Sequence, residues 1–337
     1  MKNRFVLAPM TNSQSREDGV LADEEYKWLT MRAKGGFGLT MTCAAHVQAR
    51  GKGFPGQLGV FSDVHLEGLT RLAAGIKAHD SIAIVQIQHS GMRSPAELIG
   101  ETPVCPSDDE ETKARAMTTE EVEELIEDFI AAAVLAEQAG FDGVEIHGAH
   151  GYIISQFLSP EINQRSDPYG GTAENRSRLL FEIVAGIRRQ CGADFSLGVR
   201  LSPERFGMRL AEVIEVAQRL MHEGGIDFLD MSLWDLYKEP EEEAFKGRTL
   251  MSYFTDLDRG GVRLGVTGNI RTPQDAEKAL EAGADWVMLG RVAMLHHDFP
   301  NQCQNNPSFT PVEIPVTREY LHSRRSVRQI LGVHQLA

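Results

Sequence analysis

The sequence predicts a closed (β/α)8 barrel as a single domain, and three observations support this prediction. The 337-residue chain alternates strand-like apolar runs with helical stretches eight times, with no break in composition. Polar residues and glycines gather where the predicted strands end, which is the face of such barrels that carries active sites. The turn after the first strand, Pro9-Met10-Thr11, has no glycine, which argues against a doubly wound nucleotide-binding fold.

The strands and helices can be placed one by one. Strands are expected at residues 3–8, 37–45, 82–88, 143–147, 195–201, 228–232, 262–266 and 284–289. Helices are expected at residues 23–34, 63–79, 118–139, 174–190, 210–223 and 249–257, and one more that starts at Thr272-Pro273. Asp23 is expected to cap the first helix, and Thr118 begins a pattern typical of a capping box.

Two stretches fall outside this alternation. Residues 90–117 are expected to form a long loop, which in a compact domain is usually functional or mobile. The barrel is expected to occupy residues 1–300, and residues 301–337 to form a tail with a helix near 317–331. Arginines of that tail, Arg324, Arg325 and Arg328, are more simply interpreted as a solvated helix face than as contacts to a neighbouring subunit.

Composition limits the class of protein. A net charge of −14 argues against nucleic acid or an anionic membrane as the main partner. The four cysteines are far apart and form no C-x-x-C pattern, so no metal site is expected and free thiols are favoured. No apolar run approaches the length of a membrane span, and no signal peptide is indicated. These features predict a cytoplasmic protein.

The segment with the most distinctive chemistry follows the fourth predicted strand. His147, His150 and Tyr152 lie within six residues at its carboxyl end. Imidazole and phenol groups there can donate hydrogen bonds to a developing oxyanion and deliver a proton. A lone histidine in such a place is usually an ordinary loop residue, whereas these three together favour an active site. A polar loop at residues 163–171 comes next.

A second group of residues lies at the ends of the last two predicted strands. Gly268-Asn269 ends the seventh strand, and Gly290-Arg291 ends the eighth. Barrels commonly bind phosphate at this position through backbone N–H groups. Glycine lets the backbone approach closely, and arginine adds a charged, planar donor. Either pair alone indicates only a tight turn, but the two together favour a phosphate-bearing ligand.

Several motifs identify a family that this chain resembles. They are NRFVLAPMT, VQIQHSG, EIHGAHGYIISQFLSPEINQRSDPYGG, NRSRLLFEIV, GVRLSP, VTGNI and VMLGR. With their spacing they resemble the Old Yellow Enzyme family of FMN-dependent ene-reductases, also called NADH:flavin oxidoreductases. The resemblance implies a flavin-binding (β/α)8 barrel, in agreement with the strand count, with non-covalent FMN as cofactor and NAD(P)H as reductant.

The resemblance also implies roles for the residues at the strand ends. The residues that would contact the flavin ring are Ala8, Pro9, Met10, Thr11, Ala44, Gln86 and Arg200. The residues that would hold its phosphate are Gly268, Asn269, Gly290 and Arg291. A cation near N1 and O2 of the flavin, the place implied for Arg200, would stabilise the anionic reduced ring.

The implied reaction is reduction of an activated C=C bond by a ping-pong mechanism. His147 and His150 would polarise the carbonyl of an enone, and Tyr152 would protonate its α-carbon while flavin N5 delivers hydride to the β-carbon. A phenol is protonated at neutral pH, as a proton donor must be. Alternatives are reduction of nitro compounds or nitrate esters, oxidation of an amine, and a non-catalytic flavin barrel.

The two histidines favour an electrophile that carries oxygen over an amine, and a barrel that only binds flavin would not need them. The implied partner is a small-molecule substrate, and a homo-oligomer remains an open alternative. Residues 233–248, with Trp234 and Tyr237, match no family pattern.

Overall fold

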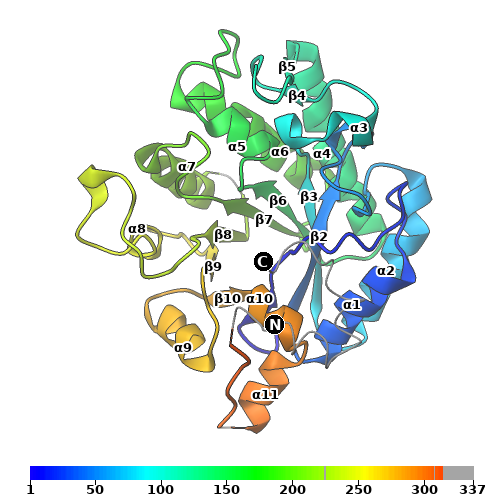
Figure 1. The fold of residues 1–337 in the computed structure, drawn as a ribbon, viewed down its shortest axis with the longest axis vertical. Helices are drawn as coiled ribbons and strands as arrows, with labels where there is room; N and C mark the ends of the chain where they lie inside the picture. The colour runs from blue at the N-terminus through cyan, green and yellow to red at the C-terminus, as the bar shows by residue number, and fades with distance from the viewer. Residues whose placement is uncertain (224, 307, 314–337) are drawn as a thin grey trace.

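The computed structural model describes residues 1–223, 225–306 and 308–313 and contains a closed barrel of eight parallel strands (Figure 1). The strands follow one another around the barrel in the order β1-β10-β9-β8-β7-β6-β3-β2. Their bounds are β1 Phe5–Leu7, β2 Leu39–His46, β3 Ile82–Gln88, β6 Gly143–Gly148, β7 Ser196–Leu201, β8 Phe228–Ser232, β9 Arg263–Thr267 and β10 Trp286–Leu289. The predicted fold class is therefore confirmed, and each strand lies within about two residues of its predicted place.

Helices surround the strands and cover the outside of the barrel (Figure 1). The longer helices are α1 Asp23–Lys34, α2 Leu66–Lys77, α4 Thr119–Gln138, α6 Ala173–Gln190, α7 Leu210–His222 and α9 Pro273–Glu281. The shorter helices are α3 Ala96–Ile99, α5 Ile153–Leu158, α8 Ser252–Thr255, α10 Arg291–Leu295 and α11 Phe299–Asn305. Two predicted helices are shorter than expected, because residues 63–65 form a 3₁₀ turn before α2 and only four residues of 249–257 are helical.

The barrel has two apolar layers, as the alternation of side chains along each strand requires. Side chains on the outer face of the strands pack against the helices and form the large core. A smaller cluster forms separately from that core and comes mainly from strand residues, namely Val6, Ala8, Leu39, Met41, Ile84, Phe228, Trp286 and Met288. This packing fixes the strand ends from which the site is built.

Helix capping agrees with the sequence at one predicted position and differs at another. The Thr118 hydroxyl accepts a hydrogen bond from the Glu121 backbone N–H, and the Glu121 carboxylate accepts one from the Thr118 backbone N–H, so the predicted capping box is present. The prediction for Asp23 is wrong, because Ala22 is the N-cap and no side chain caps α1. Asp23 is instead the first residue of the helix and forms an ion pair with Arg71 at 2.7 Å.

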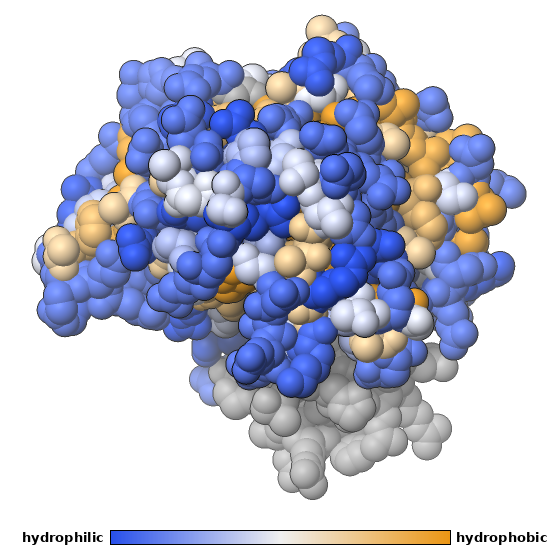
Figure 2. Space-filling view, turned by 90° about the horizontal axis from the view of Figure 1, so that it is seen from above, coloured by the Kyte–Doolittle hydropathy of each residue, from blue (hydrophilic) through white to orange (hydrophobic). Residues whose placement is uncertain are grey.

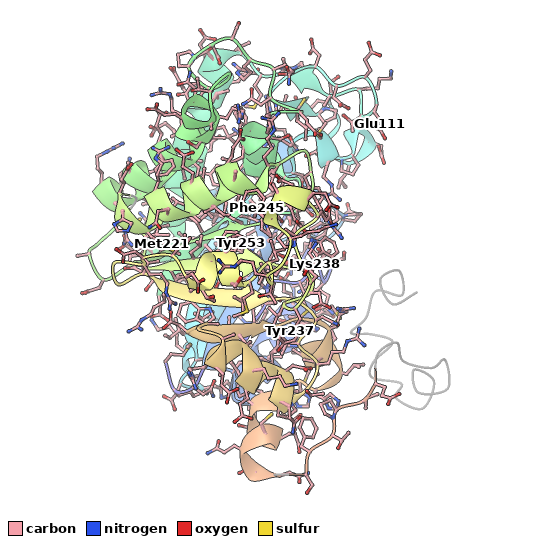
Figure 3. The ribbon with its side chains drawn as sticks, turned by 90° about the vertical axis from the view of Figure 1, so that its left-hand side faces the viewer. Glu111, Met221, Tyr237, Lys238, Phe245 and Tyr253 are labelled. Carbon is pink, nitrogen blue, oxygen red and sulfur yellow. The ribbon has the colours of Figure 1, made fainter. Side chains whose placement is uncertain are left out.

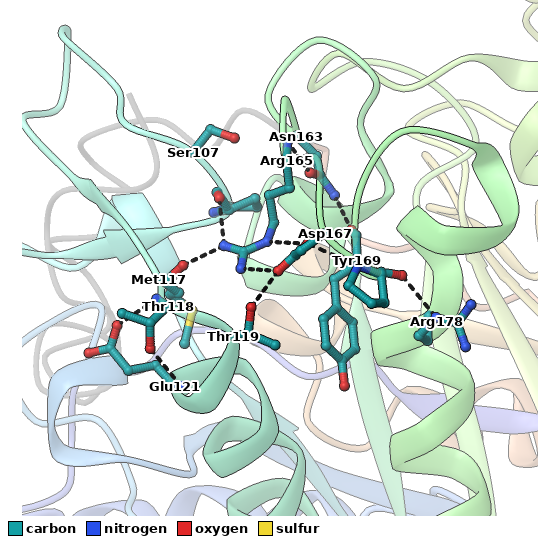
Figure 4. Close-up of polar contacts among 12 residues, drawn as sticks. Ser107, Met117, Thr118, Thr119, Glu121, Asn163, Arg165, Asp167, Tyr169 and Arg178 are labelled. Carbon is teal, nitrogen blue, oxygen red and sulfur yellow. Dashed lines mark hydrogen bonds and ion pairs between the residues drawn. The ribbon is translucent and has the colours of Figure 1, made fainter.

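Residues 90–117 are more ordered than the long loop expected from the sequence. They contain α3 and a two-stranded parallel sheet of β4 (Val104–Cys105) and β5 (Arg115–Ala116). Arg165 holds this segment by donating hydrogen bonds to the carbonyls of Pro106 and Met117 (Figure 4). Asp167 pairs with Arg165 and accepts from Thr119 at 2.8 Å. The polar loop after α5 therefore has a structural role, which is to fasten the neighbouring segment to α4.

The segment between β8 and α8 folds back on itself along one side of the barrel. Figure 3 shows Tyr237, Lys238, Phe245 and Tyr253 along this side. The Tyr253 hydroxyl donates to the carbonyl of Phe245 at 2.7 Å, and the Leu250 N–H donates to the carbonyl of Lys238 at 2.8 Å. These bonds hold the segment in place and leave its first residues next to the strand ends.

The chain returns to the bottom of the barrel near its carboxyl end. Phe299 of α11 packs edge-on against Phe5 of β1, with ring centroids 5.7 Å apart. The predicted helix at 317–331, with its arginines, lies outside the described residues. The surface seen in Figure 2 is mostly hydrophilic, with apolar side chains gathered mainly at its right-hand side. None of the described helices combines the length and the apolar character that a membrane span requires.

Candidate active site

The carboxyl ends of the strands open into a cavity of about 390 Å³. Ligands bind at this end of (β/α)8 barrels, because the loops that follow the strands converge there. The lining residues are Ala8, Pro9, Met10, His150, Arg200, Ser232, Trp234, Thr267, Gly268, Asn269, Ile270, Met288, Gly290, Arg291 and Met294. A larger hollow of about 630 Å³ lies on the outside between α4, α6 and α7, away from the strand ends.

Most of the residues predicted from the sequence meet at this cavity. Those in its lining are Ala8, Pro9, Met10, His150, Arg200, Gly268, Asn269, Gly290 and Arg291. Those outside the lining are Thr11, Ala44, Gln86, His147 and Tyr152. Thr11 follows Met10 in the chain, Ala44 lies opposite Gln86 on the neighbouring strand, and His147 lies opposite Arg200.

The turn after β6 brings the two histidines and the tyrosine together. His150 and Gly151 both have positive φ angles, of 63° and 70°, which reverse the chain directly after the strand. His147 Nε2 then lies 3.2 Å from His150 Nδ1, and the His147 and Tyr152 rings meet edge-on with centroids 5.1 Å apart. A Cβ on Gly151 would come within 2.7 Å of the Phe206 ring, so this position needs glycine for both space and conformation.

The hydrogen bonds assign a tautomer to each imidazole. His147 Nδ1 accepts from the Ala149 backbone N–H at 3.3 Å, so a neutral His147 carries its proton on Nε2. That proton points at His150 Nδ1, which leaves the His150 proton on Nε2, 2.7 Å from Ser232 Oγ. The two rings therefore form one chain of donors that ends at the cavity wall.

Burial keeps both imidazoles uncharged. It lowers the pKa of His147 well below its usual value, and the nearby His150 and Arg200 lower it further. Burial, followed by the positive charges of Arg200 and Arg93, lowers the pKa of His150 to about 3. At neutral pH the pair offers N–H donors without a positive charge. Arg93 also donates to the His150 carbonyl and lies 5.2 Å from the Tyr152 ring centroid.

Arg200 lies in the cavity lining beside Ser232 and has unused donors. It is only 4 % exposed, and its Nη2 lies 3.4 Å from Ser232 Oγ. Its Nε and Nη1 are buried and have no hydrogen-bond partner in the described part of the chain. A buried guanidinium with unpaired N–H groups in a cavity lining calls for an acceptor from a ligand, such as the ring oxygens and nitrogens of a flavin.

The turns after β9 and β8 lie close together at the end of the cavity. A Cβ on Gly268 would come within 3.1–3.2 Å of the backbone of residues 234–236, so any other residue would push the two turns apart by a few tenths of an ångström. Asn269 has a φ of 55° and donates to Asp235 at 3.1 Å. Arg291, which follows the neighbouring strand β10, is exposed and also lines the cavity. A Cβ on Gly290 would make ordinary van der Waals contact with Met10 Sδ, at 3.6 Å. This arrangement suits an elongated ligand that ends in a phosphate.

Trp234 and Ser232 belong to the site but were not predicted from the sequence. Trp234 is 49 % exposed and has a φ of 61°, which is rare for a bulky residue. Its ring meets His150 edge-on at 6.4 Å, and the Arg205 guanidinium lies 4.6 Å from its centroid. The only signal in the sequence was the position of both residues at the end of a predicted strand, since that stretch matches no family pattern.

Comparison with known proteins identifies the family of this chain. The profile of the NADH:flavin oxidoreductase / NADH oxidase family matches residues 1–308. A probable NADH-dependent flavin oxidoreductase, YqiG of Bacillus subtilis, is 37 % identical over 302 residues, which cover 86 % of this chain and 81 % of that protein. An NADPH dehydrogenase of Bacillus cytotoxicus is 35 % identical over 318 residues, covering 92 % of this chain and 90 % of the relative.

Solved structures show the same fold. The Old Yellow Enzyme homologue of Zymomonas mobilis superimposes with a TM-score of 0.80 at 28 % identity, covering 93 % of this chain and 91 % of that one. A 2-naphthoyl-CoA reductase in complex with 2-naphthoyl-CoA gives a TM-score of 0.81 at 30 % identity, covering 91 % of this chain and 50 % of that one. The present chain therefore spans half of the length of that reductase.

Fold, cavity and comparisons define an NAD(P)H-dependent oxidoreductase built on an FMN-binding (β/α)8 barrel. The chain belongs to the NADH:flavin oxidoreductase / NADH oxidase family, and an Old Yellow Enzyme homologue is among the solved structures that resemble it. The sequence-based predictions of the family, of FMN as cofactor and of NAD(P)H as reductant are confirmed.

Proposed function

We propose that this protein reduces the C=C bond of α,β-unsaturated carbonyl compounds with NAD(P)H, in two alternating half-reactions. The observation that carries the proposal is the neutral His147–His150 pair beside Tyr152 at the edge of the cavity. Uncharged imidazole N–H groups suit a carbonyl oxygen, which gains negative charge only as the reaction proceeds. They offer nothing specific to an amine, which needs an acceptor for its proton.

The residues at the strand ends fit FMN. Arg200, with its two unpaired donors, and Gln86 would bind the pyrimidine end of the ring. The residues that would line the rest of the ring are Ala8, Pro9, Met10, Thr11 and Ala44. The residues that would hold the phosphate are Gly268, Asn269, Gly290 and Arg291. When bound, FMN supplies the two-electron chemistry that the protein side chains lack.

The protein's own groups would perform binding and proton transfer. When substrate binds, His147 and His150 would exchange their N–H bonds to His150 Nδ1 and Ser232 Oγ for bonds to the substrate oxygen, and so hold the enone and polarise it. Tyr152 would give the phenolic proton to the α-carbon, and its place against the His147 ring keeps donor and oxyanion groups on one turn. The similar 2-naphthoyl-CoA reductase was solved in complex with 2-naphthoyl-CoA, and the ligand of that protein is a conjugated carbonyl compound.

The location proposed for the protein is the cytoplasm. All four cysteines are free thiols in the structure, and two of them, Cys43 and Cys105, are buried. Such thiols suit a reducing compartment, where NAD(P)H is also available. The proposed partners are the nicotinamide donor and a small enone.

An anaerobic titration tests the proposed reaction. The purified holoenzyme is reduced with NADPH until its flavin absorbance is bleached, and one equivalent of 2-cyclohexen-1-one is then added. We expect the absorbance to return and one equivalent of cyclohexanone to form. If the enone leaves the flavin reduced while a nitroaromatic compound or a nitrate ester restores the absorbance, the enone assignment is wrong. The protein would then be a reductase of nitro compounds or nitrate esters.

A further inference from the structure

Two acidic side chains lie inside the barrel, and the proposed reaction uses neither of them. Glu145 of β6 and Asp230 of β8 are both 0 % exposed. β7 lies between their strands and carries Arg200, which is directly opposite Asp230 on one side and His147 on the other. Buried acids are rare unless they are paired, so this cluster under the cavity requires an explanation.

Each carboxyl group has one oxygen satisfied by a fixed donor. Gln86 Nε2 donates to Glu145 Oε1 at 2.6 Å, and Trp286 Nε1 donates to Asp230 Oδ1 at 2.9 Å. The other two oxygens, Glu145 Oε2 and Asp230 Oδ2, are buried and receive no hydrogen bond from any donor group of the described residues. In an ionised carboxylate both oxygens only accept hydrogen bonds. A hydrogen bond between Glu145 and Asp230 therefore requires a proton on one of the two carboxyl groups.

The surroundings favour a proton on Glu145. Burial raises the pKa of Glu145 well above its usual value, and the charge of Asp230 and a hydrogen bond to it raise it further. Burial also raises the pKa of Asp230, but hydrogen bonds from Glu145 and Trp286 and the charge of Arg200 oppose that rise. Arg200 can compensate one negative charge on the pair. A second negative charge would remain without a partner in the barrel interior.

We propose that Glu145 and Asp230 share a single proton, so that the pair holds one net negative charge beside Arg200. In this arrangement Glu145 is the donor to Asp230 Oδ2, and every oxygen of the pair is satisfied. Asp230 and Glu145 are positioning residues. They act through Arg200 and Gln86, whose place under the flavin pyrimidine is part of the function proposed above. The pair limits how much positive charge Arg200 presents to the ring.

Infrared spectroscopy tests the shared proton without any turnover. A buried, protonated carboxylic acid has a carbonyl-stretch band that is separate from the amide band and shifts in D2O. We expect this band in the wild-type protein, with or without FMN, and its loss in Glu145→Gln. A band from another buried acid, such as Glu25, would survive that substitution, because Glu25 accepts from Ser15 and Cys43 instead. No change between wild type and Glu145→Gln would overturn the proposal.

The midpoint potential of bound FMN tests the charge of the pair. In Glu145→Gln the amide can still accept from Gln86 and donate to Asp230, and in Asp230→Asn it can accept from Trp286 and donate to Glu145. Each single variant keeps one negative charge, so we expect the equilibrium constant for reduction to change less than threefold. The double variant loses that charge, and we expect the constant to rise about tenfold, about 30 mV for two electrons.

The pattern across the three variants separates the alternatives. If both acids were ionised, each single variant alone would raise the equilibrium constant for reduction about tenfold, and the double variant would raise it about a hundredfold. If both were protonated, no variant would shift it. Asp128→Asn is the matched control, because it removes a carboxylate from the outer helix α4 and should leave the potential unchanged.

The result of this experiment is distinct from a failure of the proposed function. If the double variant fails to fold or to bind FMN, the infrared band and the single variants still decide between the charge states. A wrong assignment of the enone reaction would change neither the band nor the potentials.

Discussion

The buried imidazoles of His147 and His150 should resist protonation well below neutral pH. The pKa of His150 is lowered to about 3 and that of His147 lies well below its usual value, in each case mainly by burial. A histidine with an ordinary pKa near 6.5 would be about thirtyfold more charged than neutral at pH 5. We expect both rings instead to remain almost entirely neutral at that pH, with their protons on Nε2.

Nuclear magnetic resonance of protein labelled with ¹⁵N at histidine measures this directly. Imidazole nitrogen shifts distinguish the two neutral tautomers from the charged ring, and His147→Asn and His150→Asn assign the signals. Between pH 8 and pH 5 the two rings should show the Nε2–H pattern without change. A titration midpoint near pH 6.5 for either ring, or protons on Nδ1, would refute the argument from burial.

The same shift predicts how acid affects stability. The unfolded chain takes up a proton at His150 as the pH falls through about 6.5, whereas the native protein does so only near pH 3. The contribution of this residue to the free energy of unfolding is therefore full above pH 6.5 and is lost as the pH falls. Between pH 6.5 and pH 5 the loss amounts to about 2 kcal/mol, which urea unfolding at the two pH values would detect. His150→Asn should lose less stability over this range than wild type.

Other predictions concern single substitutions. Tyr152→Phe should slow reoxidation of the reduced enzyme by an enone about 10²–10⁴-fold and leave reduction by NAD(P)H nearly normal in stopped-flow traces, and equal losses would exclude Tyr152 as the proton donor. Arg291→Ala should weaken FMN binding about 10–100-fold in a flavin-release assay, because a charge-assisted contact is lost, and full retention of flavin would mean that the phosphate lies elsewhere. Gly151→Ala should lower the free energy of unfolding by about 1–2 kcal/mol or more, since φ is 70° and Phe206 blocks the new Cβ, and an unchanged melting temperature would contradict this.

Local patterns in the sequence were sufficient to predict the barrel and many of the residues that line its cavity. Apolar alternation located the strands, and polar residues such as His147 and Arg200 marked their carboxyl ends, which parallel pairing brings to one face. Thr118 and Glu121 contain the complete capping pattern within four residues, so the start of α4 was predictable. These features depend on neighbours in the chain.

Features that depend on distant residues were not predictable in the same way. Aspartate is common at helix N-caps, but the carboxylate of Asp23 forms an ion pair with Arg71 of α2 instead. The pairing of β4 with β5 inside residues 90–117 depends on anchoring by Arg165 from a segment about fifty residues further along. Glu145 and Asp230 look like solvent-facing residues in their strands, and only closure of the barrel brings them together beside Arg200.

The origin of the two hydrogens added to an enone tests whether this protein reduces the C=C bond with proton donation from an acid of its own. The holoenzyme reduces 2-cyclohexen-1-one with unlabelled NADPH in D2O, and the cyclohexanone is analysed within minutes, against a product-only control for exchange with solvent. If an acid of the protein such as Tyr152 protonates the α-carbon, one deuterium appears there and none at the β-carbon. Failure to form cyclohexanone, or a product whose α-carbon carries no deuterium above the control, would contradict the account.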